Sequence, residues 1–262
     1  MAGVGTGGDA TMTFRAALTR LREAQKTSKG VSLYSRYVNR PVGRVFAAAA
    51  YRAGRTPNQV TALSALVSFA GIAALALVPP SWPLALCVWA ALVLGFALDA
   101  ADGQLARLRG TSSPAGEWLD HAVDCAKITA LHTAVLVTFH QHFALPGERW
   151  LLVPPVFQLA AVMIFFGGLL TDKLRPRPAA PPGAPAPAPS RLRAVALLPV
   201  DYGTMCALFL LLGDERLFRL GYALLACVYV LFCAAFSVKW FRELSAAGTA
   251  AGAASASSAA RS

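Results

Sequence analysis

The chain has 262 residues, of which 56% are apolar and only 14% are charged, and its formal net charge is +11. Soluble domains carry about 25% charged residues, so this composition excludes an ordinary soluble globular protein and indicates a protein that lies in lipid. The five cysteines have no CxxC spacing and are expected to be free buried thiols. The four histidines show no metal-binding spacing either.

The first 55 residues precede any long apolar run. Residues 1–31 lack the pattern of a signal peptide and are predicted to be a disordered basic tail. Residues 32–55 place apolar side chains at helical spacing among arginines, which predicts an amphipathic helix on an anionic membrane surface. Thr56, Pro57 and Asn58 then have the types expected at a helix start, with Pro at the first helical position.

Six long apolar runs follow. A bilayer core of about 30 Å needs about 20 helical residues, and lipid offers the backbone no hydrogen bonds, so each run predicts a transmembrane helix. The runs lie near residues 59–78, 83–108, 117–139, 151–171, 194–213 and 217–239. We therefore expect an all-α membrane protein with six transmembrane helices, preceded by an amphipathic juxtamembrane helix.

The expected organisation is a six-helix catalytic domain over residues 56–244. A Pro- and Ala-rich stretch at 176–190 predicts an extended cytoplasmic loop, and residues 245–262 are low in complexity and predict a disordered tail. Asp201 and Tyr202 interrupt the fifth run with a polar break that we expect to face inward.

The orientation follows from the basic residues. With six crossings both termini share one side, and that side holds 20 Lys and Arg residues against 3 on the other. The positive-inside rule then places the termini in the cytoplasm. We expect a multi-pass protein of the cell (plasma) membrane.

Four aspartates lie at the ends of the second and third runs. Asp99 and Asp102 are three residues apart and Asp120 and Asp124 are four apart, so each pair shares one helix face. The short connection between the runs brings both pairs to a similar depth, near the cytoplasmic edge of the hydrocarbon. An intramembrane Asp costs about 2.5–3.5 kcal/mol on insertion scales and indicates a function by default.

Four such carboxylates repel one another unless positive charge lies between them. Two divalent cations would balance them, and oxygen ligands favour Mg²⁺ or Mn²⁺. The alternative is a set of ion pairs with Arg107, Arg109 and Lys127, which would account for two of the four. It would not explain the small residues Gly103 and Gly116 beside them. The spacing also excludes an EF-hand loop.

The aspartates belong to a longer pattern. Residues 99–107 read Asp-Ala-Ala-Asp-Gly-Gln-Leu-Ala-Arg, and after eight residues 116–124 read Gly-Glu-Trp-Leu-Asp-His-Ala-Val-Asp. This resembles the signature D-x2-D-G-x2-A-R-x8-G-x3-D-x3-D of the CDP-alcohol phosphatidyltransferases, with every fixed position present. The resemblance extends over roughly residues 32–240, and the signature is its only strongly specific part.

The resemblance implies roles for these residues. Asp99 and Asp120 would bridge two metal ions, Asp102 would bind one ion, and Asp124 would bind the other and act as general base. The residues expected to hold the CDP group are Asn58, Thr61, Gly103, Arg107, Thr111 and Ser113. The candidates for acceptor binding are Lys127, Lys173, Arg175 and Arg193, for which positive-inside anchoring is an equal alternative.

The implied reaction transfers a phosphatidyl group from a CDP-lipid such as CDP-diacylglycerol to the hydroxyl of a polar alcohol, and releases CMP. The acceptor is left open, and inositol phosphate and glycerol phosphate are among the candidates. The expected partners are the donor, the acceptor and the bilayer, with no nucleic acid, and a homodimer is an untested alternative. Two other functions stay open: phosphoalcohol transfer from a soluble CDP-alcohol to diacylglycerol, and divalent-cation transport.

Overall fold

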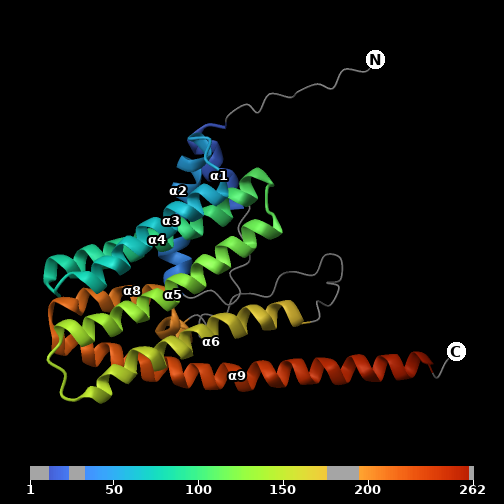
Figure 1. The fold of residues 1–262 in the computed structure, drawn as a ribbon. Helices are drawn as coiled ribbons and strands as arrows, with labels where there is room; N and C mark the ends of the chain where they lie inside the picture. The colour runs from blue at the N-terminus through green and yellow to red at the C-terminus, as the bar shows by residue number, and fades with distance from the viewer. Residues whose placement is uncertain (1–11, 24–32, 176–194, 260–262) are drawn as a thin grey trace.

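The computed structural model describes residues 12–23, 33–175 and 195–259, with side chains to residue 248, and over these ranges it contains helices and no strand. Five helical segments are long and apolar enough to cross a membrane (Figure 1). They contain the helices α3 (Pro57–Leu77), α4 (Trp82–Arg109), α5 (Pro114–His142), α6 (Val153–Leu174) and α9 (Glu215–Ala259). The chain is therefore a multi-pass membrane protein.

The helix boundaries follow local sequence. The Thr56 side chain accepts a hydrogen bond from the Gln59 amide at 3.3 Å, and the Gln59 side chain accepts one from the Thr56 amide at 3.1 Å. This capping box starts α3 at Pro57. Gly110 ends α4 with φ 65°, a left-handed conformation that glycine adopts without strain. Ser113 caps α5 by accepting a hydrogen bond from the Gly116 amide at 3.1 Å.

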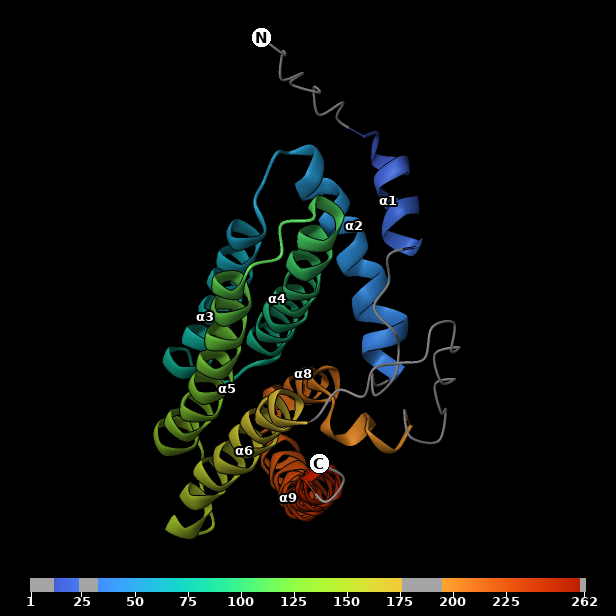
Figure 2. The same cartoon turned by 90° about the vertical axis from the view of Figure 1, so that its right-hand side faces the viewer.

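An irregular helical turn η1 (Ser35–Asn39) and the helix α2 (Arg40–Arg52) precede the bundle. Figure 1 and Figure 2 show α2 running across the long axis of the bundle beside α4. Gln104 donates a hydrogen bond to the Arg40 carbonyl, and Arg109 lies over the Tyr51 ring. These contacts hold α2 against the C-terminal end of α4, which contains the first part of the signature.

The prediction of disorder for residues 1–31 is wrong for residues 14–23, which form helix α1 (Phe14–Glu23). Ala17 and Leu21, four residues apart, are buried in a small cluster with α2 and α4. This apolar spacing gives a short helix a face to bury, which composition alone did not reveal. The rest of the predicted tail lies outside the described residues.

The structure also places most of the predicted disordered C-terminal tail in a helix. Helix α9 continues without a break to Ala259, so only residues 260–262 of that tail lie outside the described residues. The segment is rich in alanine and contains no proline, and alanine has the highest intrinsic helix propensity. The predicted Pro- and Ala-rich loop at 176–190 lies outside the described residues.

The fifth apolar run differs from a single spanning helix. Its regular part is a shorter apolar helix over Tyr202–Gly213, made of α8 (Tyr202–Leu208) and the 3-10 turn η4 (Phe209–Gly213). Asp201 accepts a hydrogen bond from the Gly203 amide at 2.7 Å and so caps α8. The polar break therefore starts a helix where we predicted only an interruption.

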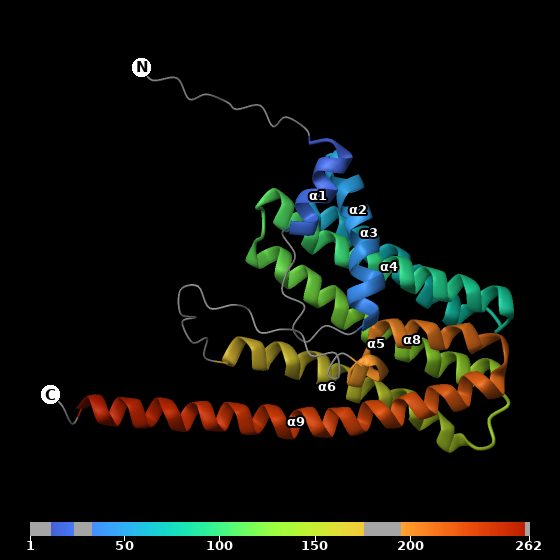
Figure 3. The ribbon, with the colours of Figure 1, turned by 180° about the vertical axis from the view of Figure 1, so that it is seen from behind.

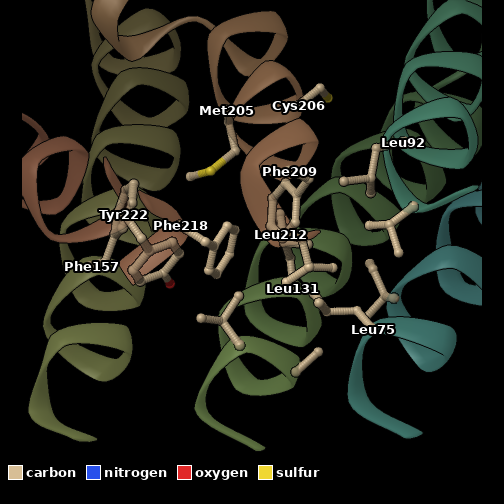
Figure 4. Packing of buried hydrophobic residues seen from close by; sticks show 14 of the residues in the cluster. Leu75, Leu92, Leu131, Phe157, Met205, Cys206, Phe209, Leu212, Phe218 and Tyr222 are labelled. Carbon is tan, nitrogen blue, oxygen red and sulfur yellow. The ribbon is translucent and has the colours of Figure 1, made fainter. Parts of the chain in front are cut away.

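The connections lie at two opposite ends of the bundle. In Figure 3 the α3–α4, α5–α6 and α8–α9 connections lie together on the right, and the α4–α5 connection lies with the C-terminal part of α9 on the left. The main core lies between α3, α4, α5, α6, α8 and α9. Figure 4 shows Leu75, Leu92, Leu131, Phe157, Phe209 and Tyr222 converging there.

Helices α3 and α4 pack closely beside the signature. A Cβ added to Gly95 would lie 2.0 Å from the Ser68 hydroxyl oxygen. Ser64 also donates a hydrogen bond to the Gly95 carbonyl at 2.8 Å, so the small serine side chains of α3 contact the α4 backbone directly at Gly95. Small residues allow such contacts between membrane helices.

We predict that Gly95→Ala lowers stability by about 1–3 kcal/mol, because the added methyl overpacks this contact. Thermal unfolding in detergent micelles measures the effect. Gly147→Ala is the matched control, since Gly147 has extended backbone and open space around its Cβ position. Equal unfolding temperatures for the two variants would contradict the predicted tight contact.

Candidate active site

The four aspartates lie on adjacent ends of α4 and α5, and the structure gives each carboxylate different surroundings. Asp102 is buried and accepts a hydrogen bond from the Thr61 hydroxyl at 2.5 Å, which ties α4 to the start of α3. Asp99 is mostly buried, with a side-chain exposure of 16%, whereas Asp120 and Asp124 are more accessible at 33% and 30%.

Lys127 places its ammonium group among these carboxylates. Its Nζ atom lies 2.5 Å from Asp99 Oδ1 and 3.4 Å from Asp124 Oδ1, and it donates a hydrogen bond to Ser64 at 3.0 Å. The side chain is 6% exposed, so this ion pair is screened little by water. Part of the set of ion pairs considered as an alternative to metal binding is therefore present. Among the described residues these pairs involve Lys127 rather than Arg107 or Arg109, and they leave most of the negative charge of the four aspartates uncompensated.

The site retains unused ligand atoms. Asp120 Oδ1 and His121 Nδ1 are buried and have no hydrogen-bond partner among the described residues. The ligand atoms of Asp120, His121 and Asp124 all lie within 4.8 Å of one another and could hold a metal ion. Unpartnered buried acceptors beside an excess of carboxylates fit a divalent cation, which would supply both the missing charge and the missing partner.

His121 was missed in the sequence because the four histidines were judged by their mutual spacing. The sequence feature that could have identified His121 as a candidate metal ligand is its position between Asp120 and Asp124. Its ring packs edge-on against Phe165 of α6 at 6.2 Å, so tertiary contacts contribute to its orientation.

One side of the carboxylate group opens into a cavity of about 380 Å³ at the α4–α5 connection. This volume lies within the range of small-molecule sites, about 300–1,000 Å³. All six residues expected to hold the CDP group line it: Asn58, Thr61, Gly103, Arg107, Thr111 and Ser113. Asp102 and Asp120 line it too, so a ligand bound here would contact two of the four carboxylates.

The backbone at Gly103 is open toward this cavity. A Cβ added there would meet only the Arg107 guanidinium, at 3.5 Å. An arginine fork beside an uncovered stretch of helix backbone suits a phosphate group, because guanidinium binds phosphate oxygens in a planar, bidentate way.

The other two carboxylates face a different cavity, of about 160 Å³. Asp99, Asp124 and Lys127 line it together with Ser68 and Ile128. Its remaining walls are aromatic: Phe96 from α4, Phe165 from α6 and Tyr202 from α8. The carboxylates thus stand between two cavities of different character.

The three described basic residues considered for the acceptor do not come together here. Lys127 lies within the carboxylate group, whereas Lys173 forms an exposed ion pair with Glu117 at 2.6 Å. Arg175 pairs with Glu243 of α9. Arg193 lies outside the described residues.

We predict that Lys127→Met lowers stability by about 3–5 kcal/mol in EDTA, because it leaves buried carboxylates without their positive partner. Added MgCl2 or MnCl2 should raise the unfolding temperature of this variant more than that of the wild type. Thermal unfolding in detergent measures both effects. Lys173→Met is the control and should cost less than about 1 kcal/mol, since its ion pair is exposed. Equal losses in both variants would contradict a role for the buried ammonium.

Comparison with known proteins fits this geometry. Residues 55–236 match the family model described as CDP-alcohol phosphatidyltransferase, and no curated protein matches the chain. The matched range contains all four aspartates, both cavities and the five long apolar helices up to the middle of α9. The match decides against the cation-transporter alternative. Members of the family use divalent metals, a CDP-alcohol donor and an alcohol acceptor. The chain belongs to the CDP-alcohol phosphatidyltransferase family and is an enzyme of that family.

Proposed function

We propose that this enzyme transfers a phosphatidyl group from a CDP-lipid such as CDP-diacylglycerol to the hydroxyl of a small polar alcohol and releases CMP. The observation that carries the proposal is the cavity at the α4–α5 connection. It combines the Arg107 guanidinium, the open backbone of Gly103 and the carboxylates of Asp102 and Asp120. Such a cavity suits a nucleoside diphosphate whose phosphates must reach the carboxylates.

The metal-binding roles would fall to the aspartates. The carboxylates of Asp99, Asp102, Asp120 and Asp124 would hold two divalent cations. Mg²⁺ or Mn²⁺, when bound, would neutralise the pyrophosphate charge and stabilise the oxygens that enter and leave. The proximity of His121 to Asp120 and Asp124 makes it a candidate ligand as well.

The protein side of the transfer is mainly positioning, as expected for phosphoryl chemistry. Arg107 would orient the pyrophosphate. Asp124 would accept the proton of the acceptor hydroxyl while the new oxygen–phosphorus bond forms. The bond between the lipid-linked phosphorus and the oxygen of CMP breaks, and CMP leaves with the bonding electrons.

We further propose that the chain crosses the cell (plasma) membrane six times, with residues 195–213 forming an interrupted fifth crossing. The positions of the connections support this, because α8 ends and α9 begins at the end of the bundle opposite the α4–α5 connection (Figure 1). Both termini and the site would then face the cytoplasm, on the side that carries most Lys and Arg residues.

Transfer of a phosphoalcohol from a soluble CDP-alcohol to diacylglycerol would use the same carboxylates. The donor therefore has to be tested directly. Purified enzyme in mixed micelles is supplied with Mg²⁺ or Mn²⁺ and either CDP-diacylglycerol with a panel of polar alcohols, or CDP-choline and CDP-ethanolamine with diacylglycerol. We expect metal-dependent CMP release only with CDP-diacylglycerol, and release only from the soluble donors would overturn the proposal.

We predict that Asp124→Asn lowers the rate of CMP release by at least about 100-fold, because general-base catalysis contributes about 10²–10⁴ and metal binding is weakened too. Asp214→Asn is the matched control. Asp214 caps α9 at the opposite end of the bundle by accepting a hydrogen bond from Leu217, and asparagine can keep that contact. Comparable losses in both variants would indicate a folding defect and not a catalytic role.

Arg107→Ala tests the donor cavity separately. We predict that it raises KM for CDP-diacylglycerol by about 10-fold or more, because a charge-assisted contact to phosphate is worth about 1.5–3 kcal/mol. Steady-state rates at varied donor and saturating acceptor measure this. An unchanged donor KM would contradict binding of the nucleotide in this cavity.

A further inference from the structure

Helix α1 lies outside the part of the chain that matches the family, and it has no part in the proposed reaction. The match begins at residue 55, whereas α1 ends at Glu23. One side of α1 packs against α2 and α4, with Ala17 and Leu21 buried and Phe14 and Leu18 partly buried beside them. This side belongs to the fold, and the role of the remaining surface of α1 is open.

The remaining surface of α1 is basic. Arg15, Arg20 and Arg22 are all exposed. With about 3.6 residues per turn, Arg15 and Arg22 lie on one edge of the apolar stripe and Arg20 lies on the other. An apolar stripe with arginines on both edges is typical of a helix that lies in the interface between lipid and water.

The chain offers few acids to balance these arginines. Residues 12–55 contain ten Lys and Arg residues and a single acid, Glu23, and the next acid along the chain is Asp99. No ion pair joins Arg15, Arg20 or Arg22 to a carboxylate within the described part of the chain. The positive charge of α1 is therefore available to an anionic partner outside the chain.

The place of α1 in the fold brings it to the perimeter of the bundle. The cluster that buries its apolar side includes Leu98, Ala101 and Leu105 of α4, so α1 lies level with the first aspartates of the signature. In Figure 2, which looks along the bundle, α1 lies beside α2 on the side away from α3 and α5. A helix at the edge of the hydrocarbon and on the perimeter of the protein meets lipid headgroups.

The neighbouring helix α2 indicates where the lipid begins. Val42 and Val45 of α2 are exposed, and Val38 in the preceding turn continues the same exposed apolar stripe. In a membrane protein such a stripe contacts lipid, because water would leave its apolar surface unfavourably hydrated. The arginines of α1 therefore lie beside a helix that already faces lipid.

We propose that α1 is a docking helix for the anionic headgroups of the surrounding membrane, and that Arg15, Arg20 and Arg22 bind their phosphates. Guanidinium groups bind phosphate oxygens in a bidentate way, and every basic residue near an anionic surface adds to the attraction. The bound headgroups would hold α1 against α2 and against the part of α4 that carries Asp102. The proposal does not depend on which substrates the enzyme uses.

The test measures amide hydrogen exchange over residues 12–23 by mass spectrometry, in the full-length enzyme without substrate, because exchange reports the opening of a helix. The enzyme is held in nanodiscs of phosphatidylcholine alone or of phosphatidylcholine mixed with phosphatidylglycerol, at low and at high NaCl concentration. The variant combines Arg15→Gln with Arg22→Gln and keeps the apolar side of α1. The matched control combines Arg149→Gln with Arg216→Gln, which removes the same charge from exposed positions at the opposite end of the bundle (Figure 3).

We expect the α1 amides of the wild type to exchange about 10-fold more slowly with phosphatidylglycerol than with phosphatidylcholine alone. High NaCl should reduce this difference, because salt screens exposed charges. The α1 variant should lose most of the difference and match the wild type in phosphatidylcholine, and the control should behave as the wild type does.

Equal exchange of the wild type in the two lipids would overturn the proposal, as would an α1 variant that keeps the full difference. Faster exchange of that variant in phosphatidylcholine alone would also contradict it, because the arginines would then contribute to packing and not to lipid binding.

Discussion

The structure depends on how four carboxylates are accommodated at the edge of a membrane. Charges in this environment are poorly solvated, so each carboxylate needs a specific partner. Asp102 has the Thr61 hydroxyl, and Asp99 and Asp124 share the Lys127 ammonium. Asp120 has a buried oxygen with no partner among the described residues. This incomplete compensation favours the binding of cations, because a bound cation would neutralise the negative charge that has no partner.

The close contact between α3 and α4 makes this arrangement rigid. Gly95 removes the side chain that would separate the two helices, and Ser64 then reaches both the Gly95 carbonyl and Lys127. The same contact brings Thr61 to Asp102. Helix packing and charge compensation therefore use the same few residues, so a packing change at Gly95 would also disturb the carboxylates.

The carboxylates also divide the interior into two spaces. The cavity toward the α4–α5 connection has an arginine, hydroxyl groups and an open glycine backbone, whereas the cavity toward α6 and α8 has aromatic walls. Helix α8 completes the second space, and the N-terminal segment at Tyr34 and Ser35 contacts both α8 and α4. A segment far from the signature in sequence thus contributes to the surroundings of the site.

The sequence by itself determined the family and five of the six predicted apolar helices, because these depend on composition and on fixed spacing along neighbouring helices. Through the resemblance that the signature carries, it also named six residues that all line the Arg107 cavity: Asn58, Thr61, Gly103, Arg107, Thr111 and Ser113. The structure differs from the disorder expected at α1 and at the end of α9, where helical spacing and alanine propensity favour a helix despite a composition typical of disorder. Only the tertiary structure decided that Lys127 lies between Asp99 and Asp124, that His121 joins Asp120, and that Tyr202 lines a cavity with them. These contacts join side chains on different helices or depend on how helices are rotated against each other, and a single sequence contains no direct record of either.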